Sequence, residues 1–411
     1  MKFHSIRIQN YKSINDITLY LSDVNLLIGP NNSGKSNILS ALKLFSDYIY
    51  FLNKNEYPSD SEFVKGITYL SGDQYGEIYA PINFTVRFIG DNLPFYILNI
   101  YIEPDFDYDR HEIRHSFVIS KSIEFSNLAD IFENSVYVEF DGLSMENYQS
   151  LFSFSPSKLF NKTVNIFNGS NQNTNQAFLF RNALISNFSD SSIYNVQVEK
   201  LKSPARLTTN EDSVFPDGSN IVSFIDSMRD TNPKIIREIE KDLFRFTKEF
   251  ESIRLIKVPN NINLDATFKK LGLADKDDNT FWSDQLSEGV LYFLALLAII
   301  HQPNPPHLFM LEEPEKGVHP RRIKEIIELI FQIAKDKNIR IILTTHSPFV
   351  VDEFADVPEG VHIVDKIDKS TQVKNLKRDF IDKEEGKEDK IDYLSSLGEH
   401  WSIGFLGGVP E

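Results

Sequence analysis

Apolar residues form continuous runs at some places in the chain and helically spaced patterns at others. Continuous runs are typical of strands buried on both faces; they lie at residues 24–29, 307–312 and 339–345. Helical spacing, in places with a proline at its start, predicts helices; it is found at residues 37–51, 220–230, 233–250 and 320–336. Strands that alternate with helices predict an α/β fold with a mostly parallel sheet.

The first part of the chain favours antiparallel strands instead. Alternating apolar and polar residues at 3–8 and 17–21 predict a hairpin. Residues 67–140 are rich in aromatic and β-branched residues, which favours further strands, including one at 135–140. Residues 141–200 are rich in Asn, Ser and Phe and show no period. We therefore expect a mixed or parallel sheet with helices, an antiparallel N-terminal β subdomain and an inserted middle region.

These patterns predict four parts of the chain. They are an N-terminal lobe (1–100), an inserted or lid region (101–215), a C-terminal lobe (216–366) and a C-terminal tail (367–411). The tail is charged and weakly patterned until residues 401–411, WSIGFLGGVPE. That last stretch either packs on the fold or contacts a partner, and packing is the better supported alternative.

Composition narrows the class of protein. The chain has 411 residues, no cysteine and a net charge of -16. The acidic balance argues against a generally basic nucleic-acid-binding surface, and the lack of cysteine excludes a disulfide framework. The first residues show no secretory signal pattern, and the longest apolar run is shorter than the roughly 20 residues that a membrane helix needs. We expect a cytoplasmic protein without a membrane association.

The segment GPNNSGKS, Gly29 to Ser36, follows a predicted buried strand and precedes a predicted helix. In that context G-x-x-x-x-G-K-S predicts a phosphate loop, whose backbone N–H groups surround a phosphate at a helix N-terminus. Lys35 would reach the β- and γ-phosphates of ATP, and Ser36 would supply a hydroxyl to Mg²⁺. The alternative is a chance Gly-rich turn, which the strand and helix on either side argue against. The predicted nucleotide-binding residues are Asn31, Asn32, Ser33, Gly34, Lys35, Ser36 and Asn37.

A second motif, LFMLEEPEKGVHP, places acids at the end of a predicted buried strand. Ligands bind at such strand ends in parallel sheets. We assign Glu312 to Mg²⁺ and Glu313 to the water that attacks the phosphate. Glu315 is the poorer alternative, because Pro314 turns the chain before it. The simpler interpretation is that these acids merely end a strand.

His346 ends the third apolar run, in TTHSP. A single histidine is usually structural. At this strand end, however, it could bond the γ-phosphate or the attacking water. Glu313 and His346 are the predicted catalytic residues.

Together, and in this order, the segments resemble those of the ATP-binding-cassette (ABC) ATPases. They are GPNNSGKS, QLSEGV, LFMLEEPEKGVHP and TTHSP, preceded by IRIQNYKSINDITLYL, which is similar to the first hairpin of the RecF/Rad50/SMC-like branch. Within that branch the chain is most similar to the OLD-family ATPases, without their Toprim nuclease domain. Glu312 departs from the Asp of many cassettes, and the absence of cysteine excludes a Rad50-type zinc hook.

The resemblance implies functions for further residues. In this family the signature loop reads the ATP held by a second subunit, which assigns Ser287, Glu288 and Gly289 to a site completed in trans. Lys12 stands where a basic residue commonly lies near the nucleotide. Arg206, in EKLKSPAR, stands in a segment similar to one near the nucleotide in OLD-like heads.

The resemblance also implies a homodimer of heads, or a higher oligomer, that uses ATP and Mg²⁺. Single-head relatives commonly control a separately encoded effector, a nuclease or toxin in anti-phage or toxin–antitoxin systems. The alternative is a RecF-like clamp on DNA, which the acidic charge disfavours. A transporter ATPase is disfavoured by the hairpin and by the acidic motif.

Overall fold

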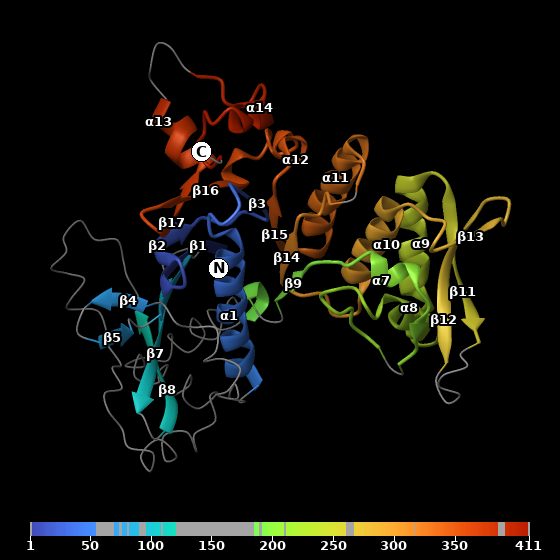
Figure 1. Cartoon of the computed structure of the whole chain (residues 1–411), viewed down its shortest axis with the longest axis horizontal. Coiled ribbons are helices and arrows are strands. Elements are labelled where there is room, and N and C mark those ends of the chain that lie inside the picture. Colours follow the sequence, from blue (N-terminus) through green and yellow to red (C-terminus); the bar gives the residue numbers. More distant parts are fainter. Residues whose placement is uncertain are drawn as a thin grey trace, which may run out of the picture. The chain divides into compact units, whose positions relative to one another are not determined.

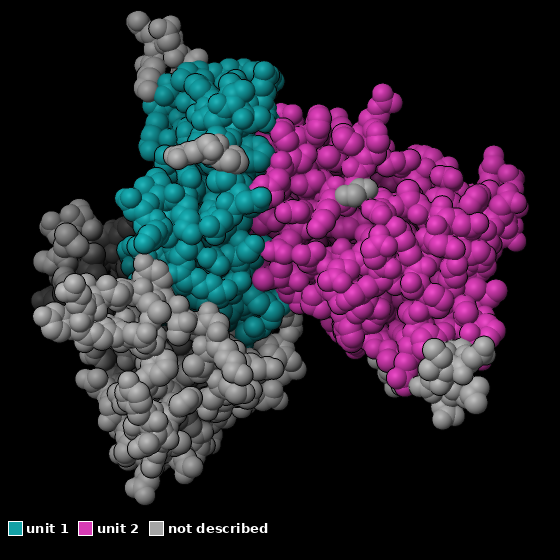
Figure 2. Space-filling model, viewed as in Figure 1, with its two compact units in different colours: residues 1–191, 354–411 teal, residues 192–353 magenta. Residues whose placement is uncertain are grey.

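The structure of the protein is a computed structural model. It describes residues 2–54, 70–73, 76–79, 82–89, 96–107, 110–120, 185–188, 191–208, 211–259, 267–316, 318–384 and 391–409. These residues form two compact units (Figure 2). Unit 1 comprises residues 1–191 and 354–411, and unit 2 comprises residues 192–353. This division does not coincide with the boundaries predicted at residues 100, 215 and 366.

Unit 1 contains an antiparallel sheet of strand order β2-β1-β6-β7-β8. Its strands are β1 (Lys2–Tyr11), β2 (Ile14–Leu19), β6 (Ile82–Ile89), β7 (Tyr96–Asp107) and β8 (Arg110–Ser120). The predicted hairpin is confirmed, because β1 pairs with β2 and Ile6 lies opposite Leu19. A further hairpin joins β4 (Leu70–Asp73) and β5 (Gly76–Tyr79). The predicted strand at 135–140 lies outside the described residues.

Unit 1 also carries the first apolar run. This run forms β3 (Val24–Ile28), which is fully buried and leads into helix α1 (Lys35–Lys54). Strand β3 runs parallel to β16 (Val361–Ile367), and β16 pairs antiparallel with β17 (Ser370–Asn375). This last strand lies in the weakly patterned tail. Because its buried side chains are those of Ser370, Thr371 and Asn375, no apolar alternation indicates the strand.

The rest of unit 1 after β17 is mostly short helical turns. They are η2 (Lys377–Ile381), α13 (Asp382–Glu384) and α14 (Leu397–Ser402), and η1 (Pro358–Gly360) precedes β16.

Unit 2 contains the other two predicted buried strands. Strand β14 (Leu308–Glu312) runs parallel to β15 (Arg340–Thr345) and to the short β9 (Ser192–Tyr194). Helix α11 (Pro320–Lys337) follows β14, and α12 (Pro348–Asp352) follows β15. The parallel pairs and the antiparallel N-terminal sheet confirm the predicted mixed α/β architecture (Figure 1).

The remainder of unit 2 packs helices beside an antiparallel sheet. The strands are β10 (Ala205–Arg206), β11 (Phe250–Val258), β12 (Phe268–Asp275) and β13 (Thr280–Trp282). The helices are α7 (Glu199–Lys202), α8 (Ile221–Thr231), α9 (Pro233–Thr247) and α10 (Glu288–His301). Helix α10 packs against α8 and α9, and every side chain from Leu291 to His301 is buried. Among the described residues, no helix is long and apolar enough to cross a membrane.

His362 is a buried titratable group in this fold. It lies on β16 with no exposed surface, and its Nδ1 lies 3.1 Å from the carbonyl oxygen of Gly360. Burial lowers the pKa of His362 from 6.5 to about 4, because the charged imidazolium would lose its hydration.

Acid should therefore destabilise the wild-type protein more than a His362→Asn variant, whose amide keeps a donor for Gly360. The folded state binds fewer protons than the unfolded state between pH 6.5 and about 4. The contribution of neutral His362 to the free energy of unfolding is full above pH 6.5. It falls by roughly 3 kcal/mol as the pH drops toward 4. Urea unfolding of both proteins across this range measures the difference. An identical pH dependence would contradict a buried neutral histidine.

Candidate functional site

The predicted phosphate loop connects the end of β3 to the start of α1. Asn32 and Gly34 have positive backbone φ angles, of 64° and 112°; asparagine tolerates this conformation better than most residues. Lys35 is buried, and its ammonium donates to the carbonyl oxygens of Gly29 at 2.7 Å and Pro30 at 2.9 Å. The loop therefore curls around its own lysine at the N-terminus of α1.

The other predicted residues of the loop divide between surface and interior. Asn31, Asn32 and Ser36 are exposed. Ser33 is buried, and its hydroxyl oxygen has no hydrogen-bond partner among the described residues. The loop thus presents polar side chains and an unpaired buried hydroxyl at a helix N-terminus, which suits an anionic ligand.

Hydrogen bonds to residues distant in the sequence hold the phosphate loop in place. Asn37 donates its side-chain N–H to the Ser13 hydroxyl at 2.6 Å, and the Ser13 and Thr371 hydroxyls lie 2.7 Å apart. The Thr371 hydroxyl in turn donates to the carbonyl oxygen of Ser33 at 3.1 Å. A Cβ at Gly34 would lie 2.0 Å from the Thr371 oxygen, so only glycine fits there.

Sequence reasoning missed Ser13 and Thr371. The hairpin that contains Ser13 was recognised, but no spacing linked it to the loop. Thr371 lies in the tail that was expected to be weakly patterned. The predicted Lys12 lies in the same turn as Ser13, with its ammonium 5.2 Å from the centre of the Tyr11 ring. Burial lowers the pKa of Lys12.

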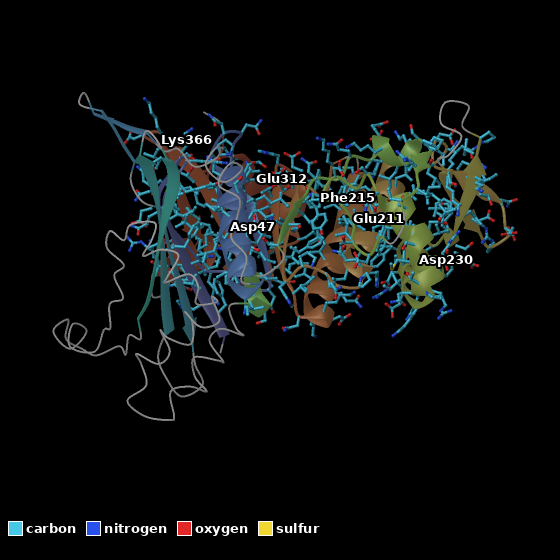
Figure 3. All side chains as sticks on the ribbon, turned by 90° about the horizontal axis from the view of Figure 1, so that it is seen from below. Asp47, Glu211, Phe215, Asp230, Glu312 and Lys366 are labelled. Carbon is cyan, nitrogen blue, oxygen red and sulfur yellow. The ribbon has the colours of Figure 1, made fainter. Side chains whose placement is uncertain are left out.

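The acidic strand end in unit 2 brings its predicted residues together. Glu312 ends β14 (Figure 3) and lies opposite Thr344 of β15. Glu313 follows with a left-handed φ of 47°, and its backbone N–H donates to the carbonyl oxygen of Thr344 at 3.0 Å. Its carboxylate lies 3.8 Å from Nε2 of His346. Parallel pairing of β14 and β15 thus sets the predicted catalytic pair side by side.

One further side chain at this edge was missed by the sequence analysis. Asn195 follows β9, which pairs with β14, and its amide donates to Oε2 of Glu312 at 3.1 Å. β9 is only three residues long, in a region without a readable period, so the sequence gave no signal for this contact.

Glu315 differs from its neighbour Glu313 in its surroundings. The Glu313 side chain is 42% exposed, whereas Oε2 of Glu315 is buried and has no partner among the described residues. Oε1 of Glu315 accepts bonds from the Thr345 hydroxyl and from the backbone N–H of His346. Burial raises the pKa of Glu315, and the charge of Glu313 raises it further.

The predicted signature loop caps the buried helix α10. The Ser287 hydroxyl accepts a bond from the Val290 N–H at 3.3 Å, and Glu288 pairs with Lys202 at 2.8 Å. Ser287 and Gly289 line a pocket of about 230 Å³ together with residues of α9, α10 and the start of α11. Arg206 lies on β10 and is exposed; its expected proximity to a nucleotide stays a prediction.

Replacing Thr371 by Val should destabilise the fold by about 1–3 kcal/mol, because the Ser33 carbonyl loses its hydroxyl donor. Ser370→Ala is the matched control. Its hydroxyl is also buried in β17 but has no partner among the described residues, so its loss should cost little. Chemical unfolding of the two variants tests the difference. Equal losses would show that the hydroxyl chain does not stabilise the loop.

Comparison with known proteins places the chain in a family. Residues 24–352 match the family described as "AAA domain, putative AbiEii toxin, Type IV TA system". Two curated relatives are energy-coupling factor transporter ATP-binding proteins EcfA2. The protein of Bacillus licheniformis is 32% identical over 72 residues, and that of Enterococcus faecalis is 28% identical over 82. These matches cover 18% and 20% of this chain, and the chain spans only 24% and 27% of the relatives' length.

Solved structures with a similar arrangement include heads of SMC proteins. The SMC head domain from Thermotoga maritima has a TM-score of 0.45 at 13% identity, over 92% of this chain and 99% of that chain. An SmcHead bound to the C-winged helix domain of ScpA has a TM-score of 0.49 at 14% identity, over 91% and 98%. Likeness at this level says nothing of function.

The family match covers 329 of the 411 residues and includes both the phosphate loop and the acidic strand end. It confirms the prediction of an ABC-type ATPase, whereas the OLD subtype stays a prediction. The chain belongs to this AAA-domain family and is an ATPase of the ATP-binding-cassette type.

Proposed function

We propose that ATP-driven dimerisation of this head controls a separately encoded effector, a nuclease or toxin in bacterial anti-phage defence. The observation that supports this proposal most directly is the pair formed by Glu313 and His346. Their side chains lie 3.8 Å apart at the ends of adjacent parallel strands. The family description, which names a putative toxin and a type IV toxin–antitoxin system, supports a place for this chain in such a system.

In this proposal Glu313 orients and deprotonates the attacking water, and His346 bonds the γ-phosphate or that water. The exposed Glu313 carboxylate can meet solvent, and its neighbour can donate through Nε2. Glu315 is unsuited to this task, because its Oε2 is buried and its Oε1 already accepts bonds from Thr345 and His346. We assign Glu315 to holding the histidine in place.

The phosphate loop is assigned to the triphosphate of ATP. Lys35 supplies positive charge, and the N–H groups from Asn32 to Ser36 supply hydrogen bonds at the N-terminus of α1. The left-handed angles at Asn32 and Gly34 support this assignment, because alternating backbone conformations turn successive N–H groups into one concavity. Asn31, Ser33 and Asn37 complete the predicted set, and Lys12 is the basic residue predicted outside the loop.

The donors present fit Mg²⁺. The exposed Ser36 hydroxyl and the Glu312 carboxylate are the oxygen ligands that this ion prefers, and Asn195 orients the carboxylate. Bound there, Mg²⁺ would supply positive charge to offset that of the phosphates.

The signature loop is proposed to act across a dimer of heads or a higher oligomer. Ser287 uses a lone pair to accept from Val290, so its hydroxyl proton can be donated to a phosphate oxygen. Gly289 opens the approach to the first N–H groups of α10, and Glu288 is fixed by Lys202. The long apolar helix behind the loop anchors these groups in unit 2.

A DNA clamp is the alternative, and charge is the observation that bears on it. The net charge is -16. Residues 372–380 of the tail, QVKNLKRDF, form a modest basic run, and two of its cations have aromatic partners. The Arg378 guanidinium carbon lies 3.6 Å from the centre of the Tyr20 ring, and the Lys374 ammonium lies 6.0 Å from that of Phe380. Both cations thus contact aromatic rings of the protein itself.

Glu313→Gln should abolish hydrolysis and trap an ATP-bound dimer. Loss of the general base lowers the rate by about 10²-fold or more, while phosphate binding is kept. Light scattering with ATP should report twice the monomer mass, and Glu328→Gln, an exposed acid on α11, should behave as wild type. A mass of Glu313→Gln that ATP does not change would count against the trans-acting signature loop.

The trapped variant also tests the choice of partner. Glu313→Gln is expressed as bait from its native locus with its neighbouring genes, captured with ATP present and analysed by mass spectrometry. A stoichiometric protein encoded next to it supports control of an effector. Bait alone with bound nucleic acid would overturn that choice in favour of the DNA clamp.

A further inference from the structure

The segment from Leu397 to Val409 is folded onto unit 1. It starts with α14, and the side chains of Leu397, Trp401 and Leu406 are buried. The indole N–H of Trp401 donates to the carbonyl oxygen of Gly408 at 3.0 Å, which ties the end of the segment to its helix. Leu397, Trp401 and Leu406 are thus packed, whereas Ile403 and Phe405 are exposed, so a partner contact of this segment stays a prediction.

The end of this segment lies against the first residue of the phosphate loop. A Cβ at Gly408 would lie 2.7 Å from Cγ2 of Ile363, and it would lie 3.6 Å from Cα of Gly29. Gly29 is equally confined, since its own Cβ would lie 2.1 Å from the carbonyl oxygen of Val364. Gly29, β16 and Gly408 therefore pack backbone to backbone, with no room for a side chain at either glycine.

This packing reaches the phosphate-binding lysine through one more contact. The carbonyl oxygen of Gly29 accepts a hydrogen bond from the Lys35 ammonium at 2.7 Å. A displacement of Gly29 would therefore move the acceptor that holds the lysine. The contacts run in order from Trp401 to Gly408, Gly29 and Lys35, all within unit 1.

We propose that Gly408 and Trp401 are positioning residues for the phosphate loop, so that nucleotide binding and packing of the 397–409 segment stabilise each other. The proposal rests on the proposed function, because it assumes that the loop binds the phosphates of ATP. Coupling of this kind is reciprocal: whatever loosens the segment weakens nucleotide binding, and bound nucleotide protects the segment by the same factor.

The test compares two glycines of the same segment. Gly408→Ala places a methyl group 2.7 Å from Ile363, beside the loop. Gly404→Ala is the matched control, because Gly404 also has a left-handed φ, of 80°, but its Cβ would meet only Val409, at 3.0 Å. Both substitutions strain the backbone, so both should lower the melting temperature. Only Gly408→Ala should weaken ADP binding measured by calorimetry, by about tenfold.

A second substitution checks the cause. Ile363→Leu removes Cγ2, the atom that a Cβ at Gly408 would meet, and should restore part of the ADP affinity to Gly408→Ala. Trp401→Phe keeps an aromatic ring but removes the N–H that binds Gly408, and should weaken ADP binding in the same direction.

The outcomes separate this proposal from the proposed function. Wild-type protein that binds no ADP would defeat the proposed function itself. Wild-type binding with equal ADP affinity in the Gly408→Ala and Gly404→Ala variants would overturn the positioning role. If Gly408→Ala does not fold, hydrogen exchange of the wild-type protein decides: ADP should slow exchange at residues 401–409, and unchanged exchange there would overturn the proposal.

Discussion

The close approach of backbones around the phosphate loop is the constraint on which the rest of unit 1 depends. Gly34 faces the Thr371 side chain and Gly29 faces the Val364 carbonyl, at separations that exclude any Cβ. Both partners belong to the β16–β17 hairpin, more than 300 residues later in the chain. The loop can keep its strained, left-handed angles because distant strands fix both of its ends. The shape of this short motif thus depends on a hairpin far along the chain.

Backbone conformation also determines the surroundings of the acids in unit 2. Glu313 and Glu315 are two residues apart, yet their surroundings differ. The Glu313 carboxylate lies beside His346, whereas Oε1 of Glu315 accepts from Thr345 and its Oε2 is buried. The left-handed backbone at Glu313, held by the Thr344 carbonyl, separates them. Burial then raises the pKa of Glu315. Two chemically identical side chains acquire different properties from the turn between them, and only one of them stays available to water.

Sequence reasoning predicted the parts of the fold and candidate site that are local in the chain. Strand β3 with its loop and helix, the acids after β14 and the histidine after β15 each stand next to a clear apolar run. Residues recruited from elsewhere were missed. Thr371, Asn195 and Gly408 carry no motif, and they act through contacts with residues more than 100 positions away. Thr371 lies on a polar strand, Asn195 follows a strand of three residues and Gly408 follows α14 in a loop, so hydrophobic pattern could not indicate them.

In the proposed function, one head completes the ATP site of another. The most direct test mixes two inactive variants by co-expression, Lys35→Ala, which loses the phosphate contact, and Ser287→Arg, which blocks the signature loop. Half of the dimers should then be mixed, and each mixed dimer has one site with both residues intact. The mixture should recover roughly a quarter of the wild-type ATPase activity. A mixture no more active than either variant alone would contradict a site shared between two copies.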